Sequence, residues 1–150
     1  MNETETTAVI GTLNQILELE LAGVVRYSHY SLMIFGHARI PIVSWMRAQA
    51  TEALAHAVSA GEYVTALGGH PSLGIGKLLE THKHDIDQIL REALDHELEG
   101  VAAYRKLLTQ AEGKSVVLEE YARQMVHGEE THVMDIEKML RRPGKLEPAR

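Results

Sequence analysis

The sequence contains one eight-residue pattern, E-L-x-G-V-x-x-Y, at residues 20–27 and again at residues 97–104. Around both copies, apolar residues recur at spacings of three and four, which is typical of one face of an α-helix. A pattern that recurs on two long helices indicates a duplicated structural unit. We therefore expect an all-α chain built from two similar helical hairpins.

Each copy of the pattern is followed by a glutamate and a histidine about one helical turn apart. The spacing is the same in both halves, because Glu52 lies 32 positions after Glu20 and Glu129 lies 32 positions after Glu97. Each hairpin would thus supply one lone glutamate and one Glu/His pair. Four carboxylates and two imidazoles that converge inside a bundle form a dinuclear metal site. The six candidate ligands are Glu20, Glu52, His56, Glu97, Glu129 and His132.

The four prolines leave long uninterrupted stretches, so we expect a single domain over residues 1–150 with four helices. The stretch from His70 to Lys77 has no apolar period and is expected to be an extended crossover. Short links within each hairpin and a long link between them favour two antiparallel hairpins joined by a long crossover, over a plain up-down bundle. The expected helices cover residues roughly 5–36, 42–67, 78–111 and 115–141, followed by a tail at 142–150.

Composition excludes several classes of function. The chain has no cysteine, so disulfides, thiolate metal sites and cysteine nucleophiles are excluded, and a reducing, cytoplasmic location is expected. A net charge of −6 without a basic run argues against nucleic acid as a partner and favours cations. No stretch approaches about 18 uninterrupted apolar residues, so no membrane span is expected.

The lone glutamates occupy positions where the apolar stripe requires an inward-facing residue. Glu20 lies between Leu17 and Val24, and Glu97 has the same setting in its own helix. A buried carboxylate is unfavourable unless it is paired, protonated or bound to a metal. Tyr27 and Tyr104 lie two turns further along the same faces, where each phenol could bond a ligand carboxylate. The alternative is a glutamate just off the stripe, in solvent.

The two Glu/His pairs differ in spacing. Glu129 and His132 are three residues apart, whereas Glu52 and His56 are four apart, so Glu52 approaches its histidine from the opposite flank. Carboxylate oxygen and neutral imidazole nitrogen together suit iron or manganese. The alternative is an exposed Glu52 beside a packed His56. His96 is expected to point away from the Glu97 side, and the remaining histidines are expected at the surface or in loops, with extra ligation or ion entry left open for His29, His37 and His127.

The sequence resembles the bacterioferritin branch of the ferritin-like family over residues roughly 8–141. The run L-N-x-x-L-x-x-E-L that ends at Leu21 is similar to the family's first metal-helix motif, and Tyr27 falls on its tyrosine position. The run E-L-x-G from Glu97 resembles the third-helix motif, and E-E-x-H ending at His132 resembles the fourth. The resemblance implies a ferritin-like four-helix bundle.

Three departures from the family pattern stand out. The second-helix motif is E-x-x-H-A, and here Ala53 occupies the glutamate position, with Glu52 one residue early. Either Glu52 substitutes as the bridging ligand, or that half of the site is weakened or rebuilt. Leu54 occupies the position of the haem-binding methionine found in some bacterioferritins, so no haem is expected by that route. The family has a short fifth helix that lines the pores of a 24-subunit shell. The tail from Arg142 shows no clear fifth helix, so the sequence does not decide between a shell and a smaller oligomer.

The resemblance implies a ferroxidase that oxidises Fe(II) with dioxygen or peroxide, for iron storage or detoxification. It implies two iron ions, although manganese or a mixed pair stays open, and a homo-oligomer of at least two chains. Two alternatives remain: a di-metal oxidoreductase without a shell, acting on peroxide or an organic substrate, and a metal-free structural bundle. The implied roles are terminal ligands for Glu20 and Glu97, bridges for Glu129 and Glu52, and one nitrogen each for His56 and His132.

Overall fold

The computed structural model describes residues 1–147 and contains four long helices. Between these residues there is no strand. The predicted all-α bundle of two antiparallel hairpins joined by a long crossover is confirmed. Residues 148–150 of the predicted tail lie outside the described part. The helices are α1 (Glu3–Met33), α2 (Arg39–Ala66), α3 (Ile86–Ala111) and α4 (Val116–Leu140).

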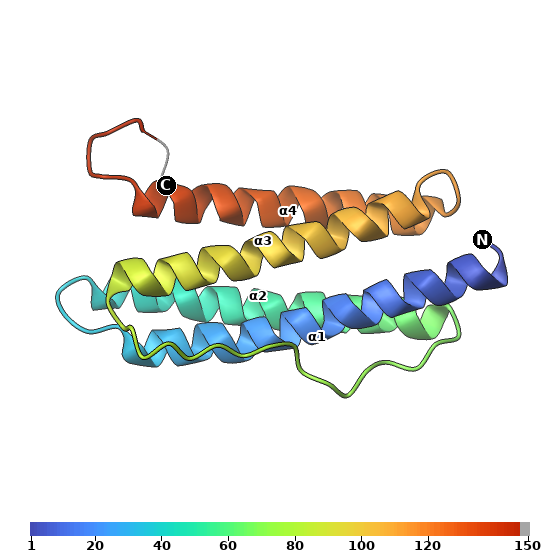
Figure 1. Ribbon diagram of the computed structural model, residues 1–150, viewed down its shortest axis with the longest axis horizontal. Helices are drawn as coiled ribbons and strands as arrows, with labels where there is room; N and C mark the ends of the chain where they lie inside the picture. Colours follow the sequence, from blue (N-terminus) through green and yellow to red (C-terminus); the bar gives the residue numbers. More distant parts are fainter. Residues whose placement is uncertain (148–150) are drawn as a thin grey trace.

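The helices are arranged as two pairs, α1 with α2 and α3 with α4, and α1 also packs against α3 (Figure 1). The crossover between α2 and α3 returns along α1 from one end of the bundle to the other. It is attached there by hydrogen bonds: Asn14 bonds the backbone of His70 and of Ser72, and the Gly76 amide donates to the Glu18 carbonyl at 2.8 Å.

The crossover is longer than the sequence indicated, because α3 begins at Ile86 rather than near residue 78. Asp85 is its N-cap, and the side chain of Asp85 accepts a hydrogen bond from the Gln88 amide. The apolar pair Leu78 and Leu79, which fits a helical period, is exposed and lies in the extended segment instead. Contacts of the crossover with α1 therefore override the local apolar pattern.

The end of α1 and the start of α2 also differ from expectation by a few residues, whereas α3 ends at Ala111 as expected. Helix α1 ends at Met33, where Arg39 donates hydrogen bonds to the carbonyls of Ser31 and Ile34. Helix α2 begins at Arg39 rather than at residue 42, because Pro41 fits in a first helical turn, whose amides have no partner within the helix.

The predicted glycine stop at the end of α2 is confirmed. Gly68 has a φ of +78°, a left-handed conformation that glycine adopts without strain. Its amide bonds the Thr65 carbonyl and the Gly69 amide bonds the Val64 carbonyl, which completes a Schellman motif. This motif ends α2, and the chain continues into the crossover that runs along α1.

Two apolar clusters fill the bundle, one near each end. The layer between them, halfway along the helices, is where the candidate ligands lie. The first cluster includes Val9, Leu13, Ile16, Val64, Leu107 and Leu118. The second includes Ile34, Val43, Met46, Ile89, Leu90 and Ile136.

Truncation of a core residue should have a much larger effect than truncation of an exposed residue of the same type. Leu13 is fully buried in the first cluster, whereas Leu73 in the crossover is 95% exposed. We expect Leu13→Ala to lower the free energy of unfolding by about 2–5 kcal/mol, and Leu73→Ala to change it by less than about 0.5 kcal/mol. Chemical denaturation of the metal-free protein measures both values, and equal effects would contradict this packing.

Helix α1 is long and apolar enough, by length and composition alone, to cross a membrane. Within its most apolar window, 44% of the residues are buried inside the bundle. The buried residues of α1 also include Glu20 and Arg26, which bond other helices. Packing in the bundle therefore accounts for the buried part of this apolar helix, while Val25 and Leu32 of the same helix are exposed.

Candidate metal centre

The structure brings all six predicted ligands into the layer between the two apolar clusters. Three of the four carboxylates are almost completely buried: Glu20 and Glu97 are 6% exposed and Glu129 is 4% exposed. His56 and His132 are partly buried beside them, and Glu52 is half-buried. Three buried acids in one layer require compensation by protons, by the two imidazoles or by cations.

One group of candidate ligands joins three helices. The Nδ1 atom of His56 on α2 lies 3.4 Å from Glu20 Oε1 on α1 and 3.2 Å from Glu129 Oε1 on α4. The Tyr104 hydroxyl on α3 donates a 2.7 Å hydrogen bond to the same Glu20 oxygen. This orients the carboxylate, as the sequence predicted for a tyrosine at that position.

A second group lies on the α3–α4 side. The Nδ1 atom of His132 is 3.9 Å from Glu97 Oε2 and 3.8 Å from Glu129 Oε2. The Tyr27 hydroxyl donates a short hydrogen bond to Glu97 Oε1. Each tyrosine therefore supports the glutamate of the opposite hairpin, so the two halves of the site depend on each other.

The two groups share Glu129, which offers one oxygen to each. Within each group the candidate ligand atoms lie within 4.8 Å of one another. A carboxylate between two sets of donors is the arrangement that bridges two cations in dinuclear centres of helical bundles. The donor set, carboxylate oxygens with one imidazole on each side, fits iron or manganese.

Comparison with known families agrees with this fold. The model of the ferritin-like domain family matches residues 10–144. The chain belongs to the ferritin-like family. A search of curated proteins found no match.

Solved ferritin-like structures share the fold. The ferritin-like, diiron-carboxylate protein of Bacillus anthracis str. Ames superposes with a TM-score of 0.87 at 22% identity, over 94% of this chain and 100% of that chain. The bacterioferritin of Desulfovibrio desulfuricans, whose diiron site is described in different catalytic states, has a TM-score of 0.79 at 25% identity, over 93% and 82%. The dodecameric thioferritin, a bacterioferritin-related protein of Bacteroides fragilis, has a TM-score of 0.82 at 20% identity, over 90% and 85%.

Glu52 lies on the outer side of the two histidines. Its carboxylate oxygens are 3.6 Å from His56 Nε2 and 3.3 Å from His132 Nε2, while both Nδ1 atoms face the buried carboxylates. This agrees with the predicted approach from the opposite flank. A bridge between two cations requires a different position, so that role for Glu52 stays a prediction. In the present arrangement Glu52 can accept a hydrogen bond from each ring and fix both orientations.

The charges at the centre are strongly coupled. Burial alone would lower the pKa of His56, but the carboxylates of Glu129 and Glu20 outweigh it and raise that pKa to about 10. Glu129 and Glu97 raise the pKa of His132 to about 10 against the effect of burial. Burial and the neighbouring Glu129 raise the pKa of Glu97. Without cations, protons on the two imidazoles therefore balance part of the buried negative charge.

His96 and Arg26 form a buried pair next to the centre that the sequence reasoning did not find. His96 was expected to point away, yet it is 6% exposed and lines the same pocket as Glu97. Arg26 lies 3.5 Å from its Nδ1 atom, and burial together with this cation lowers the pKa of His96 to about 4. Helical spacing could have indicated that His96 is buried, because it lies three residues after Ala93 and four before Gly100, and both of these are buried.

Small residues make room for this histidine. A Cβ atom on Gly23 would lie 2.9 Å from His96 Nε2 and 3.4 Å from the Ala53 Cβ. Gly23 belongs to the first copy of the repeated pattern, and its counterpart Gly100 leaves only ordinary contact distances to Leu19 and Glu129. The glycine of the first copy therefore admits an extra imidazole beside the position where the family motif has a glutamate.

Leu54, at the position of the haem-binding methionine, lies half-exposed on the outer face of α2. It borders a groove that α1 and α2 form together. One ferritin-like neighbour, the bacterioferritin of Rhodobacter capsulatus, contains haem iron together with a metal-free dinuclear site. The absence of haem from the present protein stays a prediction that rests on the missing thioether.

Proposed function

We propose that this protein is a ferroxidase that oxidises two Fe(II) ions at the centre shared by its two hairpins, for iron storage or detoxification. The observation that carries the proposal is the position of Glu129 between two groups of donors in the buried middle layer. The ligands in each group are Glu20 with His56 on one side and Glu97 with His132 on the other, and Glu52 completes the set of four carboxylates. Four carboxylates would balance the four positive charges of two Fe(II) ions.

The iron supplies two electrons, one from each ion. With two protons, these electrons convert dioxygen to hydrogen peroxide, or convert peroxide to two water molecules. The protein holds the carboxylates and the Nδ1 atoms in place before the metal arrives. Tyr27 and Tyr104 retain their protons, because burial raises the pKa of each phenol, so both remain donors to the ligand carboxylates.

Anaerobic titration with Fe(II), followed by oxygen, tests this proposal. We expect saturation at two iron ions per chain and a rapid rise of Fe(III) absorbance when oxygen is added. A chain that binds no iron would instead be a structural bundle. Iron that oxidises no faster than in protein-free buffer would exclude a ferroxidase.

The raised pKa values of the two imidazoles give a prediction for pH. A nitrogen that binds a metal must be unprotonated, so binding has to displace the protons that His56 and His132 hold at neutral pH. We expect affinity for divalent cations to keep rising from about pH 7 to about pH 9, whereas an ordinary histidine, with a pKa of about 6.5, would contribute little to such a rise. Calorimetric titrations in buffers of different ionisation heat measure the released protons, and a release below about one proton per chain would contradict the prediction.

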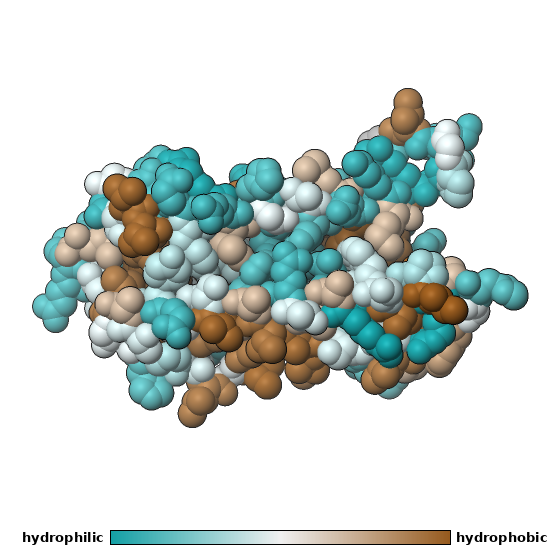
Figure 2. All heavy atoms as spheres, turned by 180° about the vertical axis from the view of Figure 1, so that it is seen from behind, coloured by the Kyte–Doolittle hydropathy of each residue, from teal (hydrophilic) through white to brown (hydrophobic). Residues whose placement is uncertain are grey.

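We also propose that the outer face of α1 and α2 pairs with a second copy of the chain. Figure 2 shows hydrophobic side chains gathered along the lower half of the rear face, where these helices lie. Leu32 of α1 and Leu54 of α2 line the groove between the helices and are at least half-exposed, as is Val58 of α2. Apolar surface of this kind is typical of an interface in an oligomer.

A charge in this face should separate the subunits. We expect Leu54→Glu to lower the molar mass measured by sedimentation or light scattering, and Leu73→Glu in the crossover to leave it unchanged. A monomeric parent protein would contradict the pairing. A hollow assembly would support storage, and a dimer would support detoxification or the second candidate below.

The second candidate is a di-metal oxidoreductase that acts on peroxide or an organic substrate. The methyl group of Ala53 favours it, because this buried side chain lines the pocket where the family motif has a bridging carboxylate. A methyl group supplies no ligand oxygen, so a coordination position would stay free for a ligand from solution. Continued turnover of peroxide with an added reductant, without accumulation of ferric mineral, would favour this function over the ferroxidase.

A further inference from the structure

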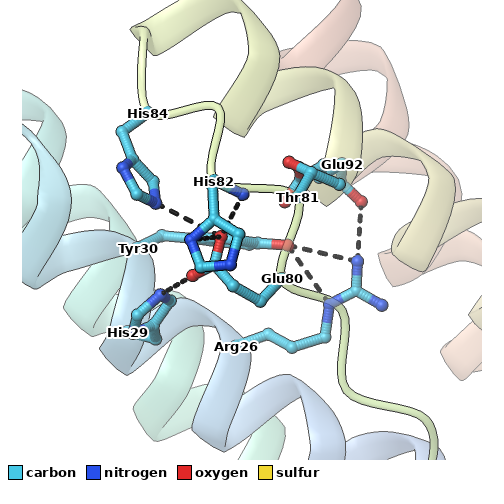
Figure 3. A network of polar contacts seen from close by, with 8 residues as sticks. All are labelled: Arg26, His29, Tyr30, Glu80, Thr81, His82, His84 and Glu92. Carbon is cyan, nitrogen blue, oxygen red and sulfur yellow. Dashed lines mark hydrogen bonds and ion pairs between the residues drawn. The ribbon is translucent and has the colours of Figure 1, made fainter.

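A second group of metal-binding side chains lies where the crossover ends, outside the dinuclear centre. His29 of α1 faces Glu80 and His84 of the crossover (Figure 3). The His29 Nε2 atom is 2.8 Å from one Glu80 oxygen, and the His84 Nε2 atom is 3.3 Å from the other. These three donor atoms lie within 4.8 Å of one another, which brings them within reach of one cation.

The surrounding contacts fix the position of Glu80. The backbone amide of His82 donates a hydrogen bond to the Glu80 carboxylate, and the next residue, Thr81, bonds the Glu92 side chain on α3. On the α1 side, Arg26 is held by the Tyr30 hydroxyl and the Glu92 carbonyl. Thr81 thus attaches the crossover to α3 beside the group, and Arg26 joins α3 to α1. The His82 amide restrains the Glu80 carboxylate in addition to the two histidines.

The chemistry of the three donors is that of a transition-metal site. Two imidazole nitrogens and one carboxylate form the His₂Glu set, which leaves a fourth position open for water. The hydrogen bond from the His82 amide, together with the nearby imidazoles, lowers the pKa of Glu80 to about 2, so the carboxylate is ionised at neutral pH. The His82 ring is 3.9 Å from Glu80 and largely exposed, so it is available as a further nitrogen donor.

We propose that His29, Glu80 and His84 bind one divalent cation of the zinc class, and that this cation ties the crossover to α1. His29 is separated from His84 by 55 positions in the sequence, so an ion held by both would close a long loop. A ligand that binds only the folded state stabilises it in proportion to its concentration and affinity. The site does not depend on the dinuclear centre and would exist whether or not that centre oxidises iron.

Titration of the full-length parent protein and of its variants with Co(II) or Zn(II) alone tests the proposal. A variant that lacks this site should bind one ion per chain fewer than the parent. We expect His29→Ala and His84→Ala each to bind one ion fewer than the parent, and Co(II) bound at this site to give the visible bands of a four-coordinate complex. The matched controls His37→Ala and His70→Ala remove exposed histidines outside the group and should bind as many ions as the parent. If the dinuclear centre binds no metal, the difference of one ion remains.

Glu80→Gln provides a variant that removes the charge but keeps the shape, in case a histidine variant folds poorly. We expect it to weaken binding at this site at least tenfold and to leave the number of ions at the dinuclear centre unchanged. Added Zn(II) should slow the hydrogen exchange of backbone amides in residues 67–85 of the parent protein. It should not slow this exchange in the Glu80→Gln variant. Equal ion counts in the parent and in all three variants would show that the group is only a cluster of ion pairs and would overturn the proposal.

Discussion

Replacing Glu129 with alanine should remove both metal ions of the dinuclear centre, not one. Among residues 1–147, Glu129 alone belongs to both candidate donor groups at this centre, with one oxygen near His56 and the other near His132. We expect affinity for Fe(II) to fall by more than the ~10–100-fold that loss of an outer partner causes, and the fast Fe(III) signal to disappear. Metal analysis after anaerobic loading and gel filtration measures the bound iron.

The neighbouring glutamate provides the control. Glu130 is partly exposed and pairs with Arg105 on the surface of the bundle. Glu130→Ala removes the same group one position along α4 and should leave two ions per chain. If Glu129→Ala retains two tightly bound ions, Glu129 does not bridge them, and the two donor groups do not form one centre.

Replacing Glu52 with alanine should weaken metal binding without changing the stoichiometry. Glu52 contacts the Nε2 edges of both histidines, so its loss would free both rings to turn away from the ions. We expect an affinity about 10–100-fold lower with two ions still bound at saturation. Glu52→Gln keeps one acceptor oxygen and should have a smaller effect.

The alternative role of Glu52 gives a different result. If it moves inward to bridge the ions when metal binds, Glu52→Ala should lose at least one ion per chain even at saturation. Glu62 is an exposed glutamate on the same helix, and Glu62→Ala should match the parent in both affinity and stoichiometry. Isothermal titration of the three variants separates the two roles.

The sequence was sufficient to predict the hairpins and the clustering of the six candidate side chains around one pocket, because both follow from periodicity. A stripe of apolar residues fixes which side of each helix faces inward, and Glu20 and Glu97 interrupt equivalent stripes. The repeated spacing then places the Glu/His pairs opposite them. The predicted start of α3 near residue 78 was wrong. Leu78 and Leu79 continue a helical period, whereas hydrogen bonds between the crossover and α1 hold the chain before these residues extended.

Other features depend on contacts that no local pattern encodes. Spacing along α2 gives the side from which Glu52 approaches, but the ring nitrogen that it contacts depends on where α4 places His132. The burial of His96 depends on Gly23 in another helix, which leaves room for the ring. The group at the crossover joins His29 to Glu80 across 51 positions of the chain, a distance that only the folded path of the crossover spans.

Anomalous diffraction at the iron edge, from crystals loaded anaerobically with Fe(II), measures the arrangement of the centre most directly. We expect two iron peaks about 3.5–4 Å apart, one near Glu20 and His56, the other near Glu97 and His132, with Glu129 between them. A single peak in the middle layer, or iron bound only at the surface while the buried carboxylates stay metal-free, would contradict a shared dinuclear centre.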